Sequence, residues 1–249
     1  KNDLVEIDKW IISEAIKLHE EVQKLNDNYA YHHVIQKIHN FCVHELGGVY
    51  LDIIKDRMYV TKSNSYARRS AQFALFEVAE ILIRLISPIL VFTAEEIWQS
   101  HELFKKQSVS IFMASQKALS EIESSISDED WKKIFAVKDA VNQSIEKART
   151  DSVIKGSLDS KISITCDKKT FKALQKIEGE LKFVFISSEV EIAESSSSVL
   201  DIEVTNFDQK KCIRCWNKCS SVGLYAEDPE ICSRCYTNVY GDGEIRKFV

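Results

Sequence analysis

Two pairs of cysteines stand near the end of this 249-residue chain, Cys212-Ile-Arg-Cys215 and Cys232-Ser-Arg-Cys235. A tight Cys-x-x-Cys turn brings two sulfurs to the same side of the backbone, so each pair can offer two thiolates to one metal ion. Two such pairs make the tetrahedral four-thiolate site that is typical of structural zinc. Because such a site has no open position for a substrate, we expect one Zn²⁺ that stabilises the fold and takes no part in catalysis.

The other three cysteines do not extend this pattern. Cys219 follows Cys215 by four residues, a poorer spacing, and we predict that it is not a ligand. Cys42 and Cys166 are scattered. Cysteines used in this way suit a reducing compartment, so we expect a cytoplasmic protein. The N-terminus has neither an initiator Met nor the order of a signal peptide, so we expect the chain to start within a longer protein.

Composition and charge limit the possible partners. The chain is 45% hydrophobic and 29% charged, which is typical of a soluble globular protein. It has no apolar run near the roughly 20 residues that a membrane span needs. The net charge of −5 argues against non-specific binding to a polyanion. A nucleic-acid partner would therefore have to meet local basic patches.

The first such patch lies next to the cysteine pairs. Arg214 and Trp216 stand there, and an arginine beside an exposed aromatic ring can contact phosphate and stack on unpaired RNA bases. The alternative is that Trp216 covers the small core of the metal module, which we define as residues 206–249. Further basic residues near the pairs are Lys218, Arg234, Arg246 and Lys247.

The second patch brackets a turn between two predicted helices. Its basic side chains could together face a phosphate backbone. Alternatively they form a solvated helix end, with Asp52 and Asp56 as ion-pair partners three or four residues away. The patch comprises Lys55, Arg57, Lys62, Arg68 and Arg69.

Catalytic patterns do not emerge from the sequence. The six histidines show no H-E-x-x-H spacing, and the chain contains no Walker A sequence, G-x-G-x-x-G or G-x-S-x-G. We therefore expect this chain by itself to have no catalytic residue.

Helical periodicity dominates the first 104 residues. Apolar residues recur every three or four positions over 6–25, 29–60 and 66–86. Ser87 and Pro88 predict the N-cap and first position of a fourth helix that runs to about residue 103. Gly47-Gly48 lowers helix stability, and we expect it to allow close packing of another helix. Helices joined by short turns predict an antiparallel bundle.

The pattern changes along the rest of the chain. We predict a linker with an extended piece at Val109–Phe112, then a helix over 128–149 that begins with a capping box at Ser127. Beyond it we predict strands at 161–166 and 183–186, extended pieces at 189–192 and 200–204, a helix at 168–179, and at most a hairpin loop at 195–198. The fold class is mainly α: an antiparallel bundle, then a small α+β unit and a four-cysteine finger. The predicted division is 1–104 helical bundle, 105–156 linker and long helix, 157–205 α+β subdomain, and 206–249 zinc finger.

Several stretches together resemble the C-terminal region of bacterial isoleucyl-tRNA synthetases. The resemblance spans essentially the whole chain in the right order. The bundle stretches are partly shared with valyl and leucyl relatives, and the four-cysteine finger favours the isoleucyl family. Besides the two cysteine pairs, these stretches are Ile7-Asp-Lys-Trp10, Asn28-Tyr29, Asn40-Phe41, Tyr50-Leu-Asp-Ile-Ile-Lys-Asp-Arg-Met-Tyr59, Pro88-Ile-Leu-Val-Phe-Thr-Ala-Glu-Glu-Ile-Trp98, Lys147-Ala-Arg149, Ile154-Lys-Gly-Ser-Leu158 and Gly241-Asp-Gly-Glu-Ile-Arg246.

The resemblance implies an aminoacyl-tRNA synthetase that attaches isoleucine to its tRNA with ATP. The ATP-site signatures of that family, H-I-G-H and K-M-S-K-S, do not occur in this sequence. The chain is thus expected to be the tRNA-recognition fragment of a ligase, monomeric, with the bundle on the anticodon stem-loop and the finger supporting it. The expected tRNA-binding residues are Arg214, Trp216, Lys55, Arg57, Arg68 and Arg69.

Two other classes compete with this interpretation. A similar finger occurs in formamidopyrimidine-type DNA glycosylases, but these need a catalytic proline and a β-rich domain, and we expect no DNA partner. The second alternative is a structural appendage that stabilises the parent enzyme without contacting RNA. Burial of Arg214 and Trp216 against the α+β unit would favour it.

Overall fold

The computed structural model describes residues 4–115, 119–120, 122–196 and 199–249. Contacts between Cα atoms divide the chain into two compact units. The first comprises residues 1–52 and 70–123, and the second comprises residues 53–69 and 124–249. Residues 53–69, which the sequence places in the bundle, thus group with the C-terminal part of the chain.

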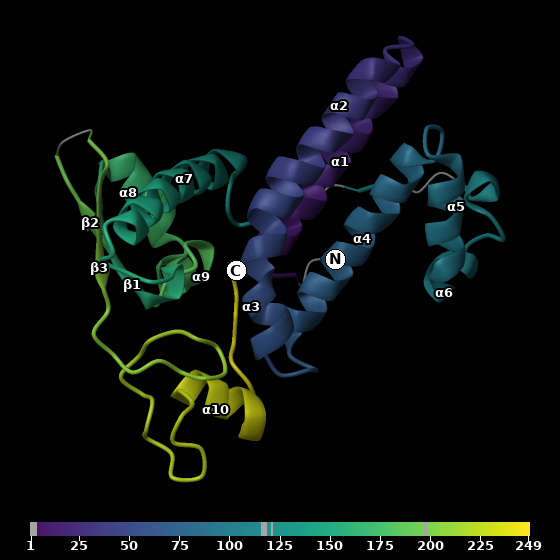
Figure 1. The fold of residues 1–249 in the computed structure, drawn as a ribbon. Helices are drawn as coiled ribbons and strands as arrows, with labels where there is room; N and C mark the ends of the chain where they lie inside the picture. The colour runs from purple at the N-terminus through teal and green to yellow at the C-terminus, as the bar shows by residue number, and fades with distance from the viewer. Residues whose placement is uncertain (1–3, 116–118, 121, 197–198) are drawn as a thin grey trace. The chain divides into compact units, whose positions relative to one another are not determined.

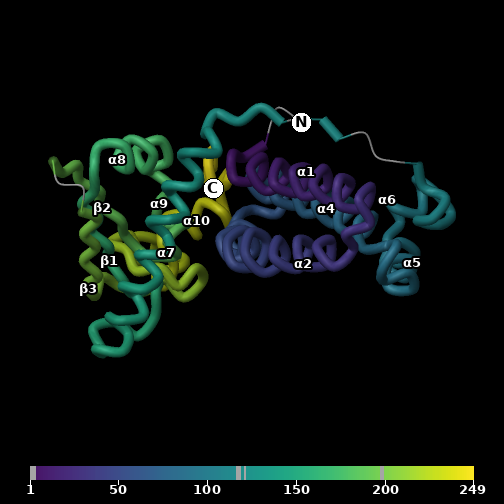
Figure 2. The backbone as a smooth tube through the Cα atoms, turned by 90° about the horizontal axis from the view of Figure 1, so that it is seen from above, coloured from purple at the N-terminus to yellow at the C-terminus, as the bar shows by residue number. Residues whose placement is uncertain are grey.

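The first unit is helical, as predicted. Its first two helices lie side by side (Figures 1 and 2) and bury apolar residues at helical spacing, among them Ile7, Ile11 and Val34. The turn between them places Tyr29 at φ 57. The helices of this unit are α1 (Glu6–Asp27), α2 (Tyr31–Phe41), α4 (Tyr66–Ile86, of which residues 70–86 belong here), α5 (Val91–Ser100) and α6 (Glu102–Lys105).

A buried carboxylate holds the start of this unit together. Asp8 on α1 is fully buried, and its Oδ1 accepts a 2.7 Å hydrogen bond from the Tyr50 hydroxyl. Its Oδ2 accepts from the Ser70 hydroxyl, whose oxygen accepts in turn from the Val5 amide at 2.9 Å. A buried carboxylate is costly unless donors surround it, so these residues act as a unit.

Tyr50→Phe is expected to lower the free energy of unfolding of the helical unit by about 1–3 kcal/mol, because Asp8 would remain buried with one donor fewer. Urea denaturation measures the effect. Tyr29→Phe is the matched control, since the Tyr29 side chain is 78% exposed. An unchanged midpoint for Tyr50→Phe would mean that Asp8 does not depend on this hydroxyl.

The predicted long helix over 29–60 contains a wide π-helical segment. After α2, the π-helix η1 (Cys42–Leu51) leads into α3 (Asp52–Val60). A Cβ on Gly47 would lie 2.9 Å from the carbonyl oxygen of Cys42, five residues earlier, and one on Gly48 would lie 3.1 Å from that of Val43. The glycine pair therefore accommodates the π turns, and our prediction that it makes room for another helix was wrong.

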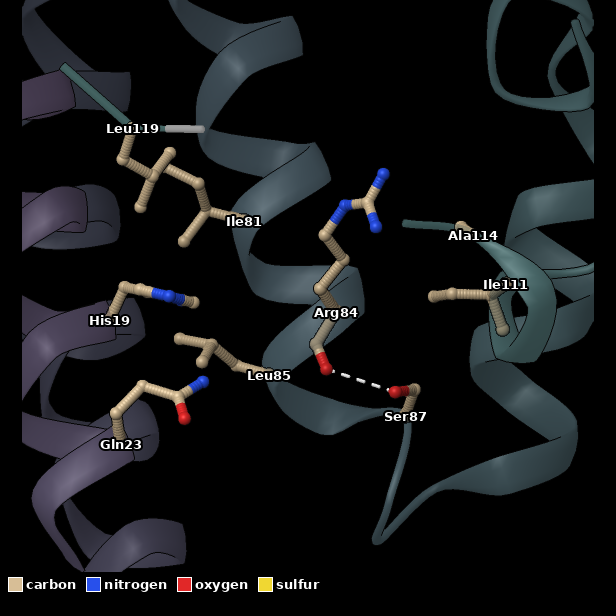
Figure 3. A pocket seen from close by; sticks show the side chains of 9 residues that line it. All are labelled: His19, Gln23, Ile81, Arg84, Leu85, Ser87, Ile111, Ala114 and Leu119. Atoms are coloured by element: carbon tan, nitrogen blue, oxygen red, sulfur yellow. Dashed lines mark hydrogen bonds between the residues drawn. The ribbon is translucent and has the colours of Figure 1, made fainter. Parts of the chain in front are cut away.

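Our prediction of where the fourth helix begins was also wrong. The Ser87 hydroxyl donates to the Arg84 carbonyl at 2.9 Å, so it closes the end of α4 (Figure 3). Helix α5 begins only at Val91, and the side chain of its N-cap residue Leu90 makes no capping bond. It ends at Ser100, and α6 follows with His101 as its N-cap. The residues after Pro88 form a turn instead of the first helical turn.

The second unit contains the predicted α+β fold. Helix α7 (Asp128–Thr150) begins at Ser127, whose Oγ accepts from the Asp130 amide at 3.2 Å, as the capping signal predicted. Strand β1 (Ser160–Cys166) is central in a three-stranded sheet, parallel to β2 (Glu189–Glu194) and antiparallel to β3 (Asp201–Asn206). Helix α7 packs on β3, and α8 (Lys168–Gln175) packs on β2. The remaining elements here are η3 (Ser157–Asp159), η4 (Glu178–Glu180), α9 (Leu181–Val184) and α10 (Ser233–Tyr240).

Three short predictions were wrong, two in the type of element and one in the connection between strands. The apolar run at 183–186 belongs to helix α9 and the residues that follow it, and the run at 109–112 leads into the 3₁₀ turn η2 (Ile111–Met113). A short, mainly apolar stretch fits either a strand or a helix, and tertiary packing decides between them. The loop predicted at 195–198 does not join a hairpin, because β2 and β3 flank β1, and residues 197–198 lie outside the described residues.

Among the described residues, none of the helices combines the length and the apolar character that crossing a membrane requires.

Candidate metal centre

The four predicted cysteines come together in the structure. Cys212 and Cys215 lie in the turn after β3, where the Trp216 amide donates to the Cys212 carbonyl at 2.9 Å. Cys232 and Cys235 lie at the start of α10, and the Cys232 amide points to the Cys212 sulfur at 3.3 Å. All four side chains are buried, and their sulfurs lie within 4.8 Å of one another.

The sulfur arrangement fits a tetrahedral zinc ion. Zn–S bonds of about 2.3 Å in tetrahedral geometry place two sulfurs about 3.8 Å apart. The Sγ atoms of Cys215 and Cys232 are 3.7 Å apart. Cys219 packs on the edge of the cluster with its sulfur 3.3 Å from the Ser221 hydroxyl, as expected for a residue that is not a ligand.

Hydrogen bonds among the cysteines shift the pKa values of their thiols in opposite directions. Hydrogen bonds from Cys232 and Cys235 hold the pKa of the Cys215 thiol well below its ordinary value. Because Cys232 and Cys235 donate these hydrogen bonds to Cys215, the pKa of the Cys232 thiol is raised, and the pKa of the Cys235 thiol is raised to about 12. Zinc binds cysteine as the thiolate, so metal binding at this cluster releases protons. The geometry of the four sulfurs supports a structural zinc.

The metal module packs on helix α3, which belongs to the same unit. The Val60 side chain at the end of α3 lies in one buried cluster with the four cysteines and Ile231. Arg214 is half-buried, and its Nη1 donates to the Val60 carbonyl oxygen at 2.7 Å. This bond satisfies one of the carbonyl groups that a helix leaves unpaired at its C-terminus.

Asp56 on α3 lies at the centre of a buried ionic cluster. Both its oxygens accept from the Arg234 guanidinium, at 2.8 and 2.7 Å, and Oδ2 also accepts from Arg246 at 2.6 Å. Glu244 completes the charge balance, 3.1 Å from Arg246, and the Arg246 guanidinium lies 3.1 Å above the Phe183 ring centre. Burial alone would raise the pKa of the Asp56 carboxyl, but the two guanidinium groups outweigh it and hold that pKa below its usual range.

The second predicted basic patch, around the turn after α3, is only partly exposed. Arg57 is 1% exposed, so its guanidinium is not available to a phosphate. Lys62 donates to the Gly241 carbonyl at 2.8 Å. Arg68 is half-buried, whereas Lys55 and Arg69 are exposed.

The first predicted patch divides in a similar way. Trp216 is 63% exposed and has φ 64, a left-handed conformation that a tryptophan seldom adopts. Arg214 is instead held on α3. Arg234 and Arg246, which the sequence suggested as surface cations, have mostly buried side chains, 16% and 2% exposed. One signal for these fold contacts was present in the sequence and was missed. In both cysteine pairs an arginine stands directly before the second cysteine.

A pocket in the helical unit offers no comparable chemistry (Figure 3). It lies between α1, α4 and the segment around Ile111, with His19 on one side and Arg84 on the other. The Arg84 guanidinium already binds Glu80 and the Ser115 carbonyl, at 2.9 and 2.8 Å. Its charge is thus committed to the fold.

Comparisons with known proteins agree with this arrangement. Residues 8–164 match the family described as the anticodon-binding domain of tRNA ligase, and residues 209–238 match the zinc finger found in FPG and IleRS. The first match covers more than half of the chain, so the chain belongs to the family of tRNA ligase anticodon-binding domains. The resemblance seen in the sequence and the predicted fold class are thereby confirmed.

The similar full-length proteins are isoleucine–tRNA ligases, which are enzymes. Over 98% of its length, the chain is 40% identical to the isoleucine–tRNA ligase of Alcanivorax borkumensis. It is 39% identical over its full length to the ligase of Idiomarina loihiensis, and 40% identical over 99% of its length to the ligase of Pseudoalteromonas translucida. It spans 27% of each of these relatives. The finger family is shared with FPG, whereas the match over 8–164 favours the ligase over the glycosylase.

Proposed function

We propose that this chain is the tRNA-recognition part of an isoleucine–tRNA ligase and binds the anticodon arm of an isoleucine tRNA. The observation that carries the proposal is the presence, in one chain, of an anticodon-binding domain and the finger that isoleucine–tRNA ligases share with FPG. In this proposal residues 1–104 form the anticodon-binding bundle and 206–249 the finger, with the segments 105–156 and 157–205 between them. Activation of isoleucine with ATP takes place in parts of the ligase beyond this chain.

The surface chemistry supports this proposal. An anticodon loop offers unstacked bases, and a stem offers phosphates. Trp216 presents an exposed ring to such a base, while Lys55, Arg68 and Arg69 offer positive charge to phosphates. Because the net charge is −5, we expect these local contacts to carry most of the affinity. We further propose a monomer that works in the cytoplasm, with Cys212, Cys215, Cys232 and Cys235 holding zinc.

The proposal is tested by titrating the zinc-loaded chain against an isoleucine tRNA and against the same tRNA with an altered anticodon. Fluorescence anisotropy at low salt gives both dissociation constants. We expect tighter binding to the native anticodon. Equal binding to both RNAs would contradict anticodon recognition and leave a chain that grips phosphates or only supports the ligase.

Trp216→Ala is expected to weaken binding to the isoleucine tRNA by about 1–3 kcal/mol, the usual loss when a base loses its aromatic stacking partner. Trp216→Phe keeps a ring and should lose less. Ile213→Ala is the matched control, because Ile213 is an exposed aliphatic residue on the same turn. If the alanine variant at 216 binds as tightly as that control, Trp216 does not stack on the RNA.

A further inference from the structure

The two zinc-binding pairs share one sequence, Cys-x-Arg-Cys, and both arginines contact the same helix. Arg214 from the first pair donates to the Val60 carbonyl oxygen at 2.7 Å. Arg234 from the second pair makes a bidentate bond to Asp56 at 2.7 and 2.8 Å. Asp56 and Val60 are four residues apart, so they lie on one face of α3, one turn from each other. The two turns of the metal module thus hold two successive turns of the helix.

The neighbouring face of α3 is open to solvent. Lys55 and Tyr59 are also four residues apart, and both are exposed, Tyr59 by 79%. They precede the held pair by one residue, which is about 100° around an α-helix. A positive charge and an aromatic ring one turn apart suit an RNA phosphate and an unstacked base. The face that can meet RNA is therefore next to the face that the metal module holds.

The metal module contacts the C-terminal end of a longer helical run. Helix α3 continues directly from α2 and the π-helix η1, and the carbonyl groups of its last turn have no partner within the helix. The turn after it is held by the same module, because the Lys62 amide donates to the Asn238 side chain at 3.1 Å. Both arginines lie between two zinc ligands, so their positions depend on the folded metal site.

We propose that Arg214 and Arg234 are positioning residues through which the zinc module holds α3 and sets Lys55 and Tyr59 for contact with RNA. Zinc then controls tRNA affinity through α3, in addition to any direct contact of Trp216. The RNA part of this inference rests on the proposed function, whereas the hold on α3 can be measured without RNA.

The two arginines respond differently to lysine. One lysine amine can replace the bond of Arg214 to the Val60 carbonyl, but it cannot reproduce the bidentate bond of Arg234 to a carboxylate. We therefore expect Arg214→Lys to behave like the wild type, and Arg214→Ala, Arg234→Lys and Arg234→Ala to be impaired. Lys210→Ala is the charge-matched control, since Lys210 is an exposed basic residue of the same module.

The experiment combines three readouts on the full chain: zinc content, hydrogen exchange of residues 53–60 without RNA, and anisotropy titration with the isoleucine tRNA. The impaired variants should keep one zinc, exchange faster in α3 and bind RNA ~10-fold more weakly, the scale of one lost charged hydrogen bond. Tyr59→Ala should weaken RNA binding while zinc content and exchange in α3 stay at wild-type values.

Unchanged exchange of α3 in zinc-loaded Arg234→Ala would overturn the hold on the helix. Equal losses for Arg214→Lys and Arg214→Ala would also contradict it, because the bond to the Val60 carbonyl would then not explain the role of Arg214. Unchanged affinity of Tyr59→Ala would overturn the RNA-facing assignment. If the wild type shows no preference for the native anticodon while α3 still responds to the arginine variants, the proposed function fails and the hold on α3 stands.

Discussion

Removal of zinc is expected to unfold residues 206–249 and to leave the helical unit folded. Apart from the eight-residue helix α10, the described backbone of this segment consists of turns and one isolated bridge between Lys211 and Lys218. Its buried cluster is built mainly from the four cysteines, together with Val60 and Ile231. A core as small as this seldom holds a short chain folded without a metal or another covalent staple, and structural zinc in small fingers contributes about 10–16 kcal/mol.

Hydrogen exchange after chelation measures this effect segment by segment. We expect protection to be lost over 206–249 and weakened over 53–60, and to persist in α1, α2 and the sheet, whose strand β1 buries Ile162 and Ile164 outside the cysteine cluster. Cys232→Ser should reproduce the loss. Cys219→Ser is the matched control, since Cys219 contacts Ser221 and lies outside the ligand set.

Two results would contradict the expectation. Full protection of 206–249 after complete loss of zinc would mean that the module folds without metal. Loss of zinc in Cys219→Ser, to the same extent as in Cys232→Ser, would mean that Cys219 is part of the site.

The long helices and the metal ligands could be predicted because their signals are local. Periodic apolar residues place α1, α4 and α7 within a few residues of their observed bounds, and the Cys-x-x-Cys spacing carries its own geometry. The π-helix could not be predicted in this way, because a glycine pair suits a helix break, a close contact or a wide turn equally well. The wide turn is recognised only in the structure, where a Cβ on Gly47 would lie 2.9 Å from the carbonyl oxygen of Cys42, five residues earlier.

The roles of the charged residues depend on partners far away in the sequence. Arg214 binds a carbonyl 154 residues earlier, and Arg234 binds a carboxylate 178 residues earlier. Composition gives no access to such pairs, so Arg57 and Arg234 looked like surface cations. Within the stretch from Tyr50 to Tyr59, Tyr50 and Asp56 make hydrogen bonds to α1 and to the metal module, whereas Lys55 and Tyr59 are exposed.

Asp56→Ala is expected to lower the free energy of unfolding of the second unit by about 3–5 kcal/mol, the usual cost of removing one partner from a buried ion pair. Arg234 and Arg246 would lose their shared carboxylate, and the Arg246 side chain is only 2% exposed. Glu244 remains close to both guanidinium groups, so part of the charge stays balanced. The module should then loosen from α3 while it keeps its zinc.

The measurement is denaturation of zinc-loaded protein at pH 7, with Asp242→Asn as an exposed control in the same C-terminal tail. The depressed pKa of Asp56 means that its contribution is complete above the ordinary aspartate value of about 4 and is lost as the pH falls through the lower folded value. Protonation of the cysteines releases zinc on the way to such acid, so the substitution isolates Asp56 where a pH scan cannot. A second unit as stable in Asp56→Ala as in Asp242→Asn would show that packing on Val60, and not the carboxylate, joins the module to α3.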